Sequence, residues 1–181
     1  MPFIVRDKIL GICPICEEEQ QIEIGRQIET LNIRGKSVKI DAHVKRCTVC
    51  TEVFATTEQE EKNIQEAYRQ YRQEAKLLQP EEIRVIREKY GLSQKAFAGL
   101  LGWGEITLHR YESGALQDEV HNNLLLLLDK PDNFSTIFEK NKNRLTSKQV
   151  QKVQERLSKF LVVTMTTSTF TAPRPLVFPP N

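Results

Sequence analysis

Long hydrophobic runs are missing from this chain of 181 residues. Its longest run of leucines, Leu124–Leu128, has five residues, whereas a membrane-spanning helix needs about 20 apolar residues. The first eight residues also lack the basic start, the apolar stretch and the small cleavage-site residues of a signal peptide. We therefore expect a soluble protein that works in the cytoplasm.

A strong excess of one charge is missing as well. The 26 lysine and arginine residues face 24 aspartate and glutamate residues, so the formal net charge is only +2. This balance excludes a polybasic protein, and any binding of nucleic acid must depend on a local basic patch. The length allows one domain or two small ones and excludes a large multidomain enzyme.

Groups that could serve in catalysis are scarce. The three histidines, His43, His109 and His121, are scattered along the chain. The sequence contains no phosphate-binding loop and no recognisable pair of nucleophile and base. The remaining enzymatic alternative is a dithiol oxidoreductase, and we expect a protein that is not an enzyme.

The four cysteines are the strongest chemical signal. They lie in the first 50 residues, in two pairs with C-x2-C spacing: Cys13 and Cys16, then Cys47 and Cys50. In a reducing compartment clustered cysteines favour a metal over disulfides, and four thiolates suit a tetrahedral Zn2+ ion. The pattern predicts one structural zinc ion per chain, with redox chemistry and unligated core cysteines as weaker alternatives. Because four sulfurs fill the coordination shell, we expect His43 to be an ordinary strand residue.

The residues between the two cysteine pairs predict a small β-sheet. Apolar and polar residues alternate with a period of two over residues 38–44, and residues 34–37 are typical of a turn. Such a sheet has a thin core, so the metal is expected to supply much of its stability. We assign residues 1–56 to a zinc-binding β domain.

A connecting helix is predicted over residues 57–79. Thr57 and Glu60 match a capping box at its start, and Pro80 follows its end. Apolar residues recur at intervals of three and four and form a seam along one side: Ile64, Tyr68, Tyr71, Ala75 and Leu78. This seam fits a helix packed on its own domain and a dimer contact equally well.

A helix-turn-helix is predicted within residues 80–130. Ser93 suits the N-cap of a short helix that ends at Gly102, and a second short helix ends at Gly114. Two short helices joined by a turn that contains glycine form a DNA-reading unit. The expected inward-facing residues are Ile83, Val85, Ile86, Tyr90, Phe97, Leu100, Leu101, Leu108 and Tyr111. The predicted fold class is thus α+β, with a small N-terminal β domain that binds zinc through four cysteines, followed by an all-α helix-turn-helix domain.

The second half of the chain resembles the helix-turn-helix of Xre-like repressors. The residues that carry this resemblance are Leu92-Ser93-Gln94, Ala98, Leu101-Gly102, Leu108 and Arg110–Gly114. Paired cysteine knuckles, followed by a helix and this module, resemble the MqsA (YgiT-type) antitoxin family over about residues 10–130. Glu17 and Thr51 stand after the knuckles, where that family often has glycine, so the turns at these two positions are expected to differ.

The resemblance implies a DNA-binding antitoxin of a type II toxin-antitoxin system. The zinc domain then neutralises a toxin protein, while the C-terminal half forms a homodimer on a palindromic DNA operator and represses its own operon. The alternative is a zinc-containing transcriptional regulator or a protein-interaction scaffold without a toxin partner. The near-neutral charge slightly favours the scaffold, because few phosphates can then be neutralised.

The family pattern also implies which residues touch DNA. It puts Gln94 on a phosphate and turns four residues towards the major groove: Glu105, Ile106, Thr107 and Arg110. The chemistry agrees, because Arg110 can bind guanine O6 and N7 and Ile106 suits a thymine methyl group. Lys95 is the additional phosphate contact that we expect. In the structural alternative, Arg110 bridges to Glu112 and Ile106 fills the core.

The remaining residues carry less information. The leucines at 124–128 are expected in the core or in a dimer contact. Residues 131–160 are predicted to form a C-terminal helical extension whose last helix begins at Thr146 and ends near Phe160. The tail, residues 161–181, has four prolines and a single charged residue, Arg174, and we expect it to be disordered or to form a swapped edge strand.

Overall fold

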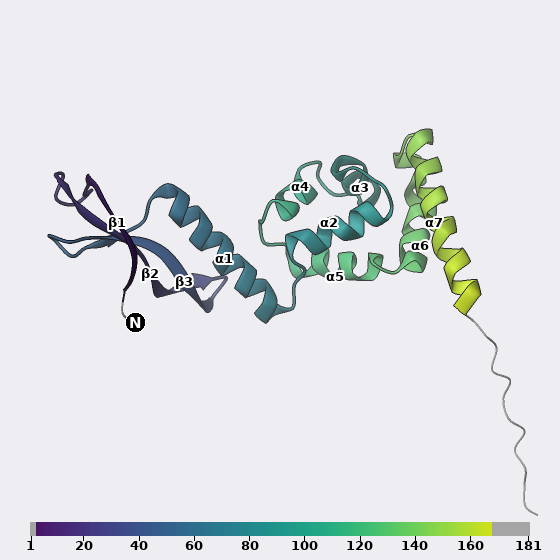
Figure 1. Cartoon of the computed structure of the whole chain (residues 1–181). Coiled ribbons are helices and arrows are strands. Elements are labelled where there is room, and N and C mark those ends of the chain that lie inside the picture. The colour runs from purple at the N-terminus through teal and green to yellow at the C-terminus, as the bar shows by residue number, and fades with distance from the viewer. Residues whose placement is uncertain (1–2, 168–181) are drawn as a thin grey trace, which may run out of the picture. The chain divides into compact units, whose positions relative to one another are not determined.

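The structure, a computed structural model, describes the backbone of residues 3–167 and the side chains of residues 3–160. Over these residues a four-stranded antiparallel sheet is followed by seven α-helices and one short 3-10 helix (Figure 1). The chain is thus α+β, as its sequence predicts. The expectations for residues 168–181 of the tail lie outside the described residues. No helix within the described part is both long and apolar enough to cross a lipid bilayer.

The contacts within the chain define two compact units, and neither is continuous in sequence. The sheet unit consists of the residues up to Ile83 together with Arg110–Leu124. The helical unit consists of Arg84–His109 together with the residues from Leu125 onward.

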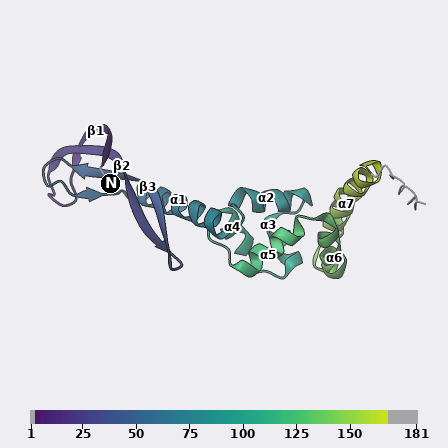
Figure 2. The same ribbon diagram turned by 90° about the horizontal axis from the view of Figure 1, so that it is seen from below.

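The sheet has the strand order β1-β2-β3-β4, with every strand antiparallel to its neighbour. The strands are β1 (Ile4–Ile12), β2 (Glu19–Ile33), β3 (Lys36–Cys47) and β4 (Val53–Phe54). The long hairpin of β2 and β3 is visible in Figures 1 and 2. Its turn residues Arg34 and Gly35 have φ values of 50° and 81°, the two left-handed conformations that a two-residue hairpin loop of type I′ requires. The predicted sheet between the knuckles is confirmed, and β1 and β4 extend it on either side.

The main core of the sheet unit lies between β3 and helix α1 (Thr57–Ala75). Alternate residues of β3 are buried: Val38, Ile40, Ala42 and Val44. Helix α1 contributes Ala67 and Tyr71 to the same cluster, and Tyr68 and Ala75 pack against it. Most of the predicted apolar seam therefore packs on its own unit. Ile64, at the start of the seam, stays partly exposed.

The capping box of α1 lies one residue earlier than the sequence predicts. The N-cap is Thr56, whose hydroxyl accepts a hydrogen bond from the backbone N–H of Gln59 at 3.3 Å. The side chain of Gln59 accepts in return from the backbone N–H of Thr56 at 3.0 Å. The prediction of Thr57 and Glu60 was wrong because Thr57 already has helical backbone, and only the extended residue before it can turn its hydroxyl onto the first helical turn.

Helix α1 ends at Ala75, ahead of the predicted end near Gln79. Lys76 adopts the left-handed conformation with φ of 55°, and its N–H donates to the carbonyls of Arg72 and Gln73. These bonds satisfy carbonyl groups that a helix terminus leaves without partners. Proline is thus not the residue that stops this helix, although Pro80 does begin the next one.

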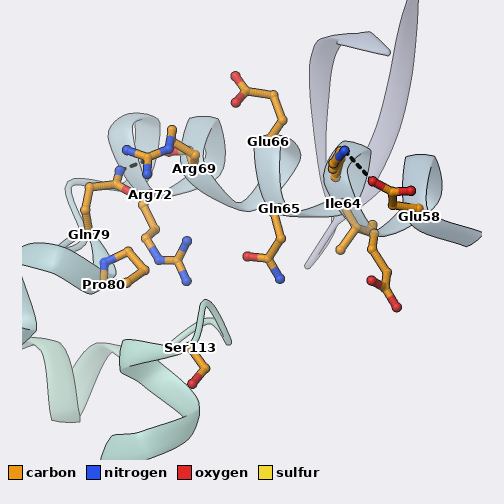
Figure 3. A pocket seen from close by; sticks show the side chains of 11 residues that line it. Glu58, Ile64, Gln65, Glu66, Arg69, Arg72, Gln79, Pro80 and Ser113 are labelled. Carbon is orange, nitrogen blue, oxygen red and sulfur yellow. Dashed lines mark hydrogen bonds and ion pairs between the residues drawn. The ribbon is translucent and has the colours of Figure 1, made fainter. Parts of the chain in front are cut away.

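The buried side chain of Arg72 fastens α1 to the residues that follow helix α4 (Thr107–Glu112). Only 1% of Arg72 is exposed, and its guanidinium donates to the carbonyls of Gly114 at 2.7 Å and Ala115 at 3.0 Å. Arg34, in the hairpin turn, donates to the next two carbonyls at 3.0 Å each. Figure 3 shows Arg72 beside the open groove, of about 670 Å³, between α1 and Ser113. Two cations therefore hold this segment against the rest of the sheet unit.

Most of the helices after α1 start where the sequence places proline or a capping side chain. They are α2 (Pro80–Lys89), α3 (Gln94–Leu101), α4, α5 (Glu119–Leu128), α6 (Pro131–Asn141), the 3-10 helix (Lys142–Arg144) and α7 (Ser147–Thr167). Pro80 and Pro131 begin α2 and α6, where a missing N–H costs nothing. Thr146 accepts from the N–H of Gln149, as predicted for α7.

Stacked aromatic rings form the core of the helical unit. The rings of Tyr90 and Phe134 lie parallel with centroids 3.5 Å apart, and Phe97 and Phe138 flank Phe134 at 6.1 and 6.3 Å. All four are fully buried. Val153 brings α7 into the buried interior of this unit. The C-terminal extension therefore supplies part of the core on which α3 rests.

Three details differ from the predicted pattern. Val85, which we expected to face inward, is 61% exposed. The core-facing positions of α2 are taken by Ile83 and Ile86, which are buried. In α5, Leu125 and Leu128 are buried whereas the two leucines between them are exposed, which is the ordinary spacing of one helix face. Helix α7 continues to Thr167 instead of ending near Phe160. No glycine or proline intervenes there, and β-branched residues lower helix propensity only slightly.

Candidate metal centre and nucleic-acid interface

The two cysteine knuckles have the same local geometry. The N–H of Glu17 donates to the carbonyl of Cys13 at 2.8 Å, and the N–H of Thr51 donates to the carbonyl of Cys47 at 3.1 Å. In each knuckle the second backbone N–H after the first cysteine points at that cysteine's sulfur at 3.4 Å. Such N–H groups stabilise negative charge on a thiolate. Each knuckle is thus a preformed cradle for sulfur.

Glu17 and Thr51 close the two knuckles in the left-handed backbone region. Their φ values are 61° and 62°, a conformation that glycine adopts freely and other residues rarely do. Thr51 is β-branched, for which positive φ is especially unfavourable. Both turns thus have the backbone conformation that glycine favours, and Glu17 and Thr51 adopt it at a cost in backbone strain.

The four sulfur atoms converge on one point. Cys13 Sγ lies 3.8 Å from Cys50 Sγ, Cys16 Sγ lies 4.0 Å from Cys47 Sγ, and all four lie within 4.8 Å of one another. A tetrahedral zinc ion with bonds of about 2.3 Å needs sulfur separations of about 3.8 Å, whereas a disulfide needs about 2.05 Å. The cluster therefore fits one structural Zn2+.

The protonation of the thiols also suits a cation. The backbone N–H of Cys16 lowers the pKa of the Cys13 thiol to about 7. The hydrogen bond with Cys50 raises the pKa of Cys16 to about 12. One thiolate forms readily, but a second one beside it needs a compensating positive charge, which Zn2+ supplies. His43 lies apart from this chemistry: it is a β3 residue whose backbone N–H donates to Asn63.

The predicted reading residues lie around the turn between α3 and α4. Ser93 caps α3 by accepting from the N–H of Ala96 at 3.2 Å, and Gly102 ends the helix with φ of 75°. Gln94 and Lys95 begin α3. Glu105 and Ile106 form the turn before α4, Thr107 begins α4, and Arg110 lies within it. Of these residues, Arg110 is counted with the sheet unit and the others with the helical unit.

The exposure of these residues bears on two alternatives: contact with DNA, or a purely structural role. Ile106 is 63% exposed, so it does not fill the core, whereas Leu108 is fully buried. Arg110 is exposed while Glu112 is buried. Ile106, in the turn before α4, and Arg110, within it, each have a side chain that is available to a ligand.

Two contacts in this region are not visible in the sequence. The ammonium of Lys95 lies 2.7 Å from a carboxylate oxygen of Glu105, and both side chains are exposed. The ring of His109 lies 3.2 Å from the side-chain oxygen of Gln94. The expected phosphate contacts thus have partners on α4 and on the turn before it. The only sequence signal for them is the helix-turn-helix pattern itself, which brings the two short helices together.

The family model of the MqsA antitoxin, the antitoxin component of a bacterial toxin-antitoxin system, matches residues 12–138. This chain belongs to the MqsA antitoxin family. The search of curated proteins found no significant match.

The MqsA match covers both features described above. It begins just before Cys13, includes all four cysteines and the α3–α4 motif, and ends within α6. It assigns this MqsA chain an antitoxin role in a toxin-antitoxin system, which implies a toxin partner and suggests a protein that is not an enzyme. The four-sulfur cluster in an MqsA chain fits a structural zinc ion. The end of α6, the 3-10 helix and α7 lie beyond the match.

Proposed function

We propose that this MqsA-type antitoxin binds a palindromic DNA operator as a homodimer, represses its own operon in the cytoplasm and neutralises a toxin through its zinc-bearing sheet. The observation that carries the DNA-binding part is the exposure of Ile106 in the turn before α4. An apolar residue left in water beside polar neighbours is unfavourable unless a ligand covers it. The thymine methyl group in a major groove provides such a cover.

The residues around Ile106 supply the polar part of the recognition. Arg110 lies four residues further along and reaches the same groove, where it can donate two parallel hydrogen bonds to guanine O6 and N7. Thr107 offers a methyl and a hydroxyl group, and Glu105 an acceptor for a cytosine amino group. Gln94 and Lys95 are the proposed phosphate contacts, which fix the register but read no base.

A homodimer follows from the size of the reading unit. One short helix contacts too few base pairs for useful specificity, and two copies one turn of DNA apart give a twofold symmetric reader. The exposed leucines of α5, Leu126 and Leu127, are the apolar surface that we propose for the contact. The seam of α1 is the weaker choice because most of it packs on the sheet.

The test is a comparison of operator and random DNA. Replacement of Arg110 by alanine is expected to cost about 1–3 kcal/mol on the operator and less on random DNA. Gln94→Ala should weaken both alike with little change in salt dependence. Loss of Lys95 should lower the slope of log K against log salt by about one unit. Titration calorimetry with the full palindrome and with one half-site measures these effects and the number of protomers bound.

The outcomes separate the alternatives. Equal losses of Arg110→Ala on both DNAs would make Arg110 a phosphate clamp and leave specificity to Ile106, Thr107 or DNA shape. Absence of binding at low salt would favour the alternative function, a zinc-containing scaffold that holds a protein partner. Binding of one protomer to the full palindrome would contradict the homodimer.

A further inference from the structure

The positive charge of this near-neutral chain is concentrated beyond the family match. Residues 139–160 contain seven basic and two acidic residues, a net charge of +5. The rest of the chain then holds 19 basic and 22 acidic residues, a net charge of −3. If DNA binding depends on a local basic patch, this stretch is where the charge for it lies.

Helix α7 presents most of these cations along one side. Lys148, Lys152, Arg156 and Lys159 follow one another at intervals of four, four and three residues, which is the spacing of a single helix face. All four are exposed, whereas Val153, which lies to one side of this row, is fully buried in the helical unit. The packing of Val153 therefore keeps the basic row out of the core. Glu155 is the one acidic residue among them.

Two of the cations of the extension lie against the ends of α3. The stem of Lys152 covers Gly91, where an added Cβ would lie 2.9 Å from its Cε. Gly91 precedes by three residues the proposed phosphate contact Gln94. At the other end of α3, Arg144 Nη1 lies 3.5 Å from the carbonyl oxygen of Gly99. An added Cβ on Gly102 would lie 2.8 Å from the same nitrogen.

These contacts connect the basic extension to the start of α3 within one unit. Lys95 lies one turn before Gly99 on α3, and Arg144 contacts the carbonyl oxygen of Gly99. The row from Lys148 to Lys159 adds about 16 Å of basic surface, comparable to half a turn of duplex. The helical unit, which carries Gln94, Lys95 and this row, thus has more cations than contact with a few bases requires.

We propose that the extension of residues 140–159 is a second, sequence-independent DNA-binding surface that holds the phosphate backbone flanking the operator half-site. The inference rests on the proposed DNA-binding function and extends it. Duplex phosphate is favoured over an acidic protein as the ligand, because the cations adjoin both ends of the helix that carries the proposed phosphate contacts. Base reading then comes from the turn and α4, and much of the affinity from the extension.

The test uses the full zinc-loaded chain and a duplex of random sequence. The triple variant Arg144→Gln, Lys148→Gln, Lys152→Gln is compared with Arg144→Lys, Lys148→Arg, Lys152→Arg, which keeps every charge. Removal of one phosphate-binding cation lowers the slope of log K against log salt by about 0.9, so the glutamine variant should lose roughly two to three units per protomer. The charge-conserving variant should keep the slope. The ratio of operator to random affinity should stay the same in both.

Circular dichroism first establishes that both variants are folded. An unchanged slope in a folded glutamine variant overturns the inference and leaves the proposed function intact. Weaker capture of the toxin with an unchanged slope also overturns it and makes the extension a protein-binding surface. If the unaltered chain binds no duplex even at low salt, the proposed DNA-binding function itself fails. A slope that falls with the charges and returns with the lysine and arginine variant supports the extension as a phosphate-binding surface.

Discussion

The sheet unit and the helical unit are stabilised by different kinds of interaction. The sheet unit has a thin main core, formed by one face of the sheet and α1. Its second cluster is small and consists of Ile22 and two buried cysteines. The helical unit has four stacked aromatic rings, all fully buried. One unit depends on a bound ion and the other on buried apolar surface.

This difference predicts which treatment destabilises each unit. Burial of large aromatic side chains stabilises by several kcal/mol without any ligand. A small sheet with a thin core gains comparable free energy only when its metal is bound, so its folding is coupled to the supply of zinc and to the protonation of its thiols. The two units should therefore respond differently to the same treatment.

Removal of zinc is expected to have the largest effect. Structural zinc sites contribute an apparent free energy of about 10–16 kcal/mol, more than the whole stability of a small domain. A chelator, or Cys47→Ser, should expose the backbone amides of β2 and β3 to hydrogen exchange. The amides of α3 and α6 should stay protected. Elemental analysis should give one zinc per chain before treatment, and protection of β2 and β3 after it would contradict the coupling.

A cavity in the aromatic stack is expected to have the opposite pattern. Phe134→Ala should destabilise the helical unit by about 3–5 kcal/mol and leave the zinc content unchanged. Trp103, the single tryptophan, lies in the helical unit, so its fluorescence during urea unfolding reports on this unit. Thr136→Ala, at an exposed position of the same helix, is the control and should cost less than about 0.5 kcal/mol. Loss of zinc from the Phe134 variant would show that the units do not differ in this way.

The smallest expected effect is a gain in the knuckles. Thr51→Gly removes left-handed strain of about 1–2 kcal/mol, and the greater freedom of unfolded glycine offsets about 0.4–1 kcal/mol of it. A net gain of about 0.5–1 kcal/mol is expected, and a smaller one for Glu17→Gly. Chelator competition measures it as slower release of zinc. Val49→Gly, in the same knuckle but without positive φ, should give no gain, and an equal gain there would refute the role of strain.

Local signals in the sequence predicted much of the fold. Period-two alternation indicated β3, proline and serine indicated the starts of α2, α3 and α6, and the C-x2-C pairs indicated the four-sulfur cluster. Each of these features is determined by residues that are neighbours in the chain or by a ligand rule that needs only spacing. The α+β class followed from them.

Features that depend on distant residues could not be predicted. The exposed strand β1 has no regular alternation, and it exists because β2 offers a free edge. The place of Phe134 in the core depends on Tyr90 stacking on it from 44 positions away. The pair of Lys95 and Glu105 depends on how two short helices meet. The cap at Thr56 shows the limit at short range, since two adjacent threonines differ only in backbone conformation.

The hydrogen bonds from Arg72 to the carbonyls of Gly114 and Ala115 bear on which fragments of this antitoxin can fold by themselves. A fragment that ends before residue 80 contains all four strands of the described residues, every cysteine and the whole of α1. It nevertheless leaves the charged groups of Arg34 and Arg72 without their acceptors. A buried guanidinium that loses its hydrogen bonds is strongly destabilising. The chain leaves the sheet unit after Ile83, returns to it for residues 110–124 and then leaves it again, so no single cut separates the two units. Dissection that respects this topology joins the first segment to residues 110–124 through a short linker.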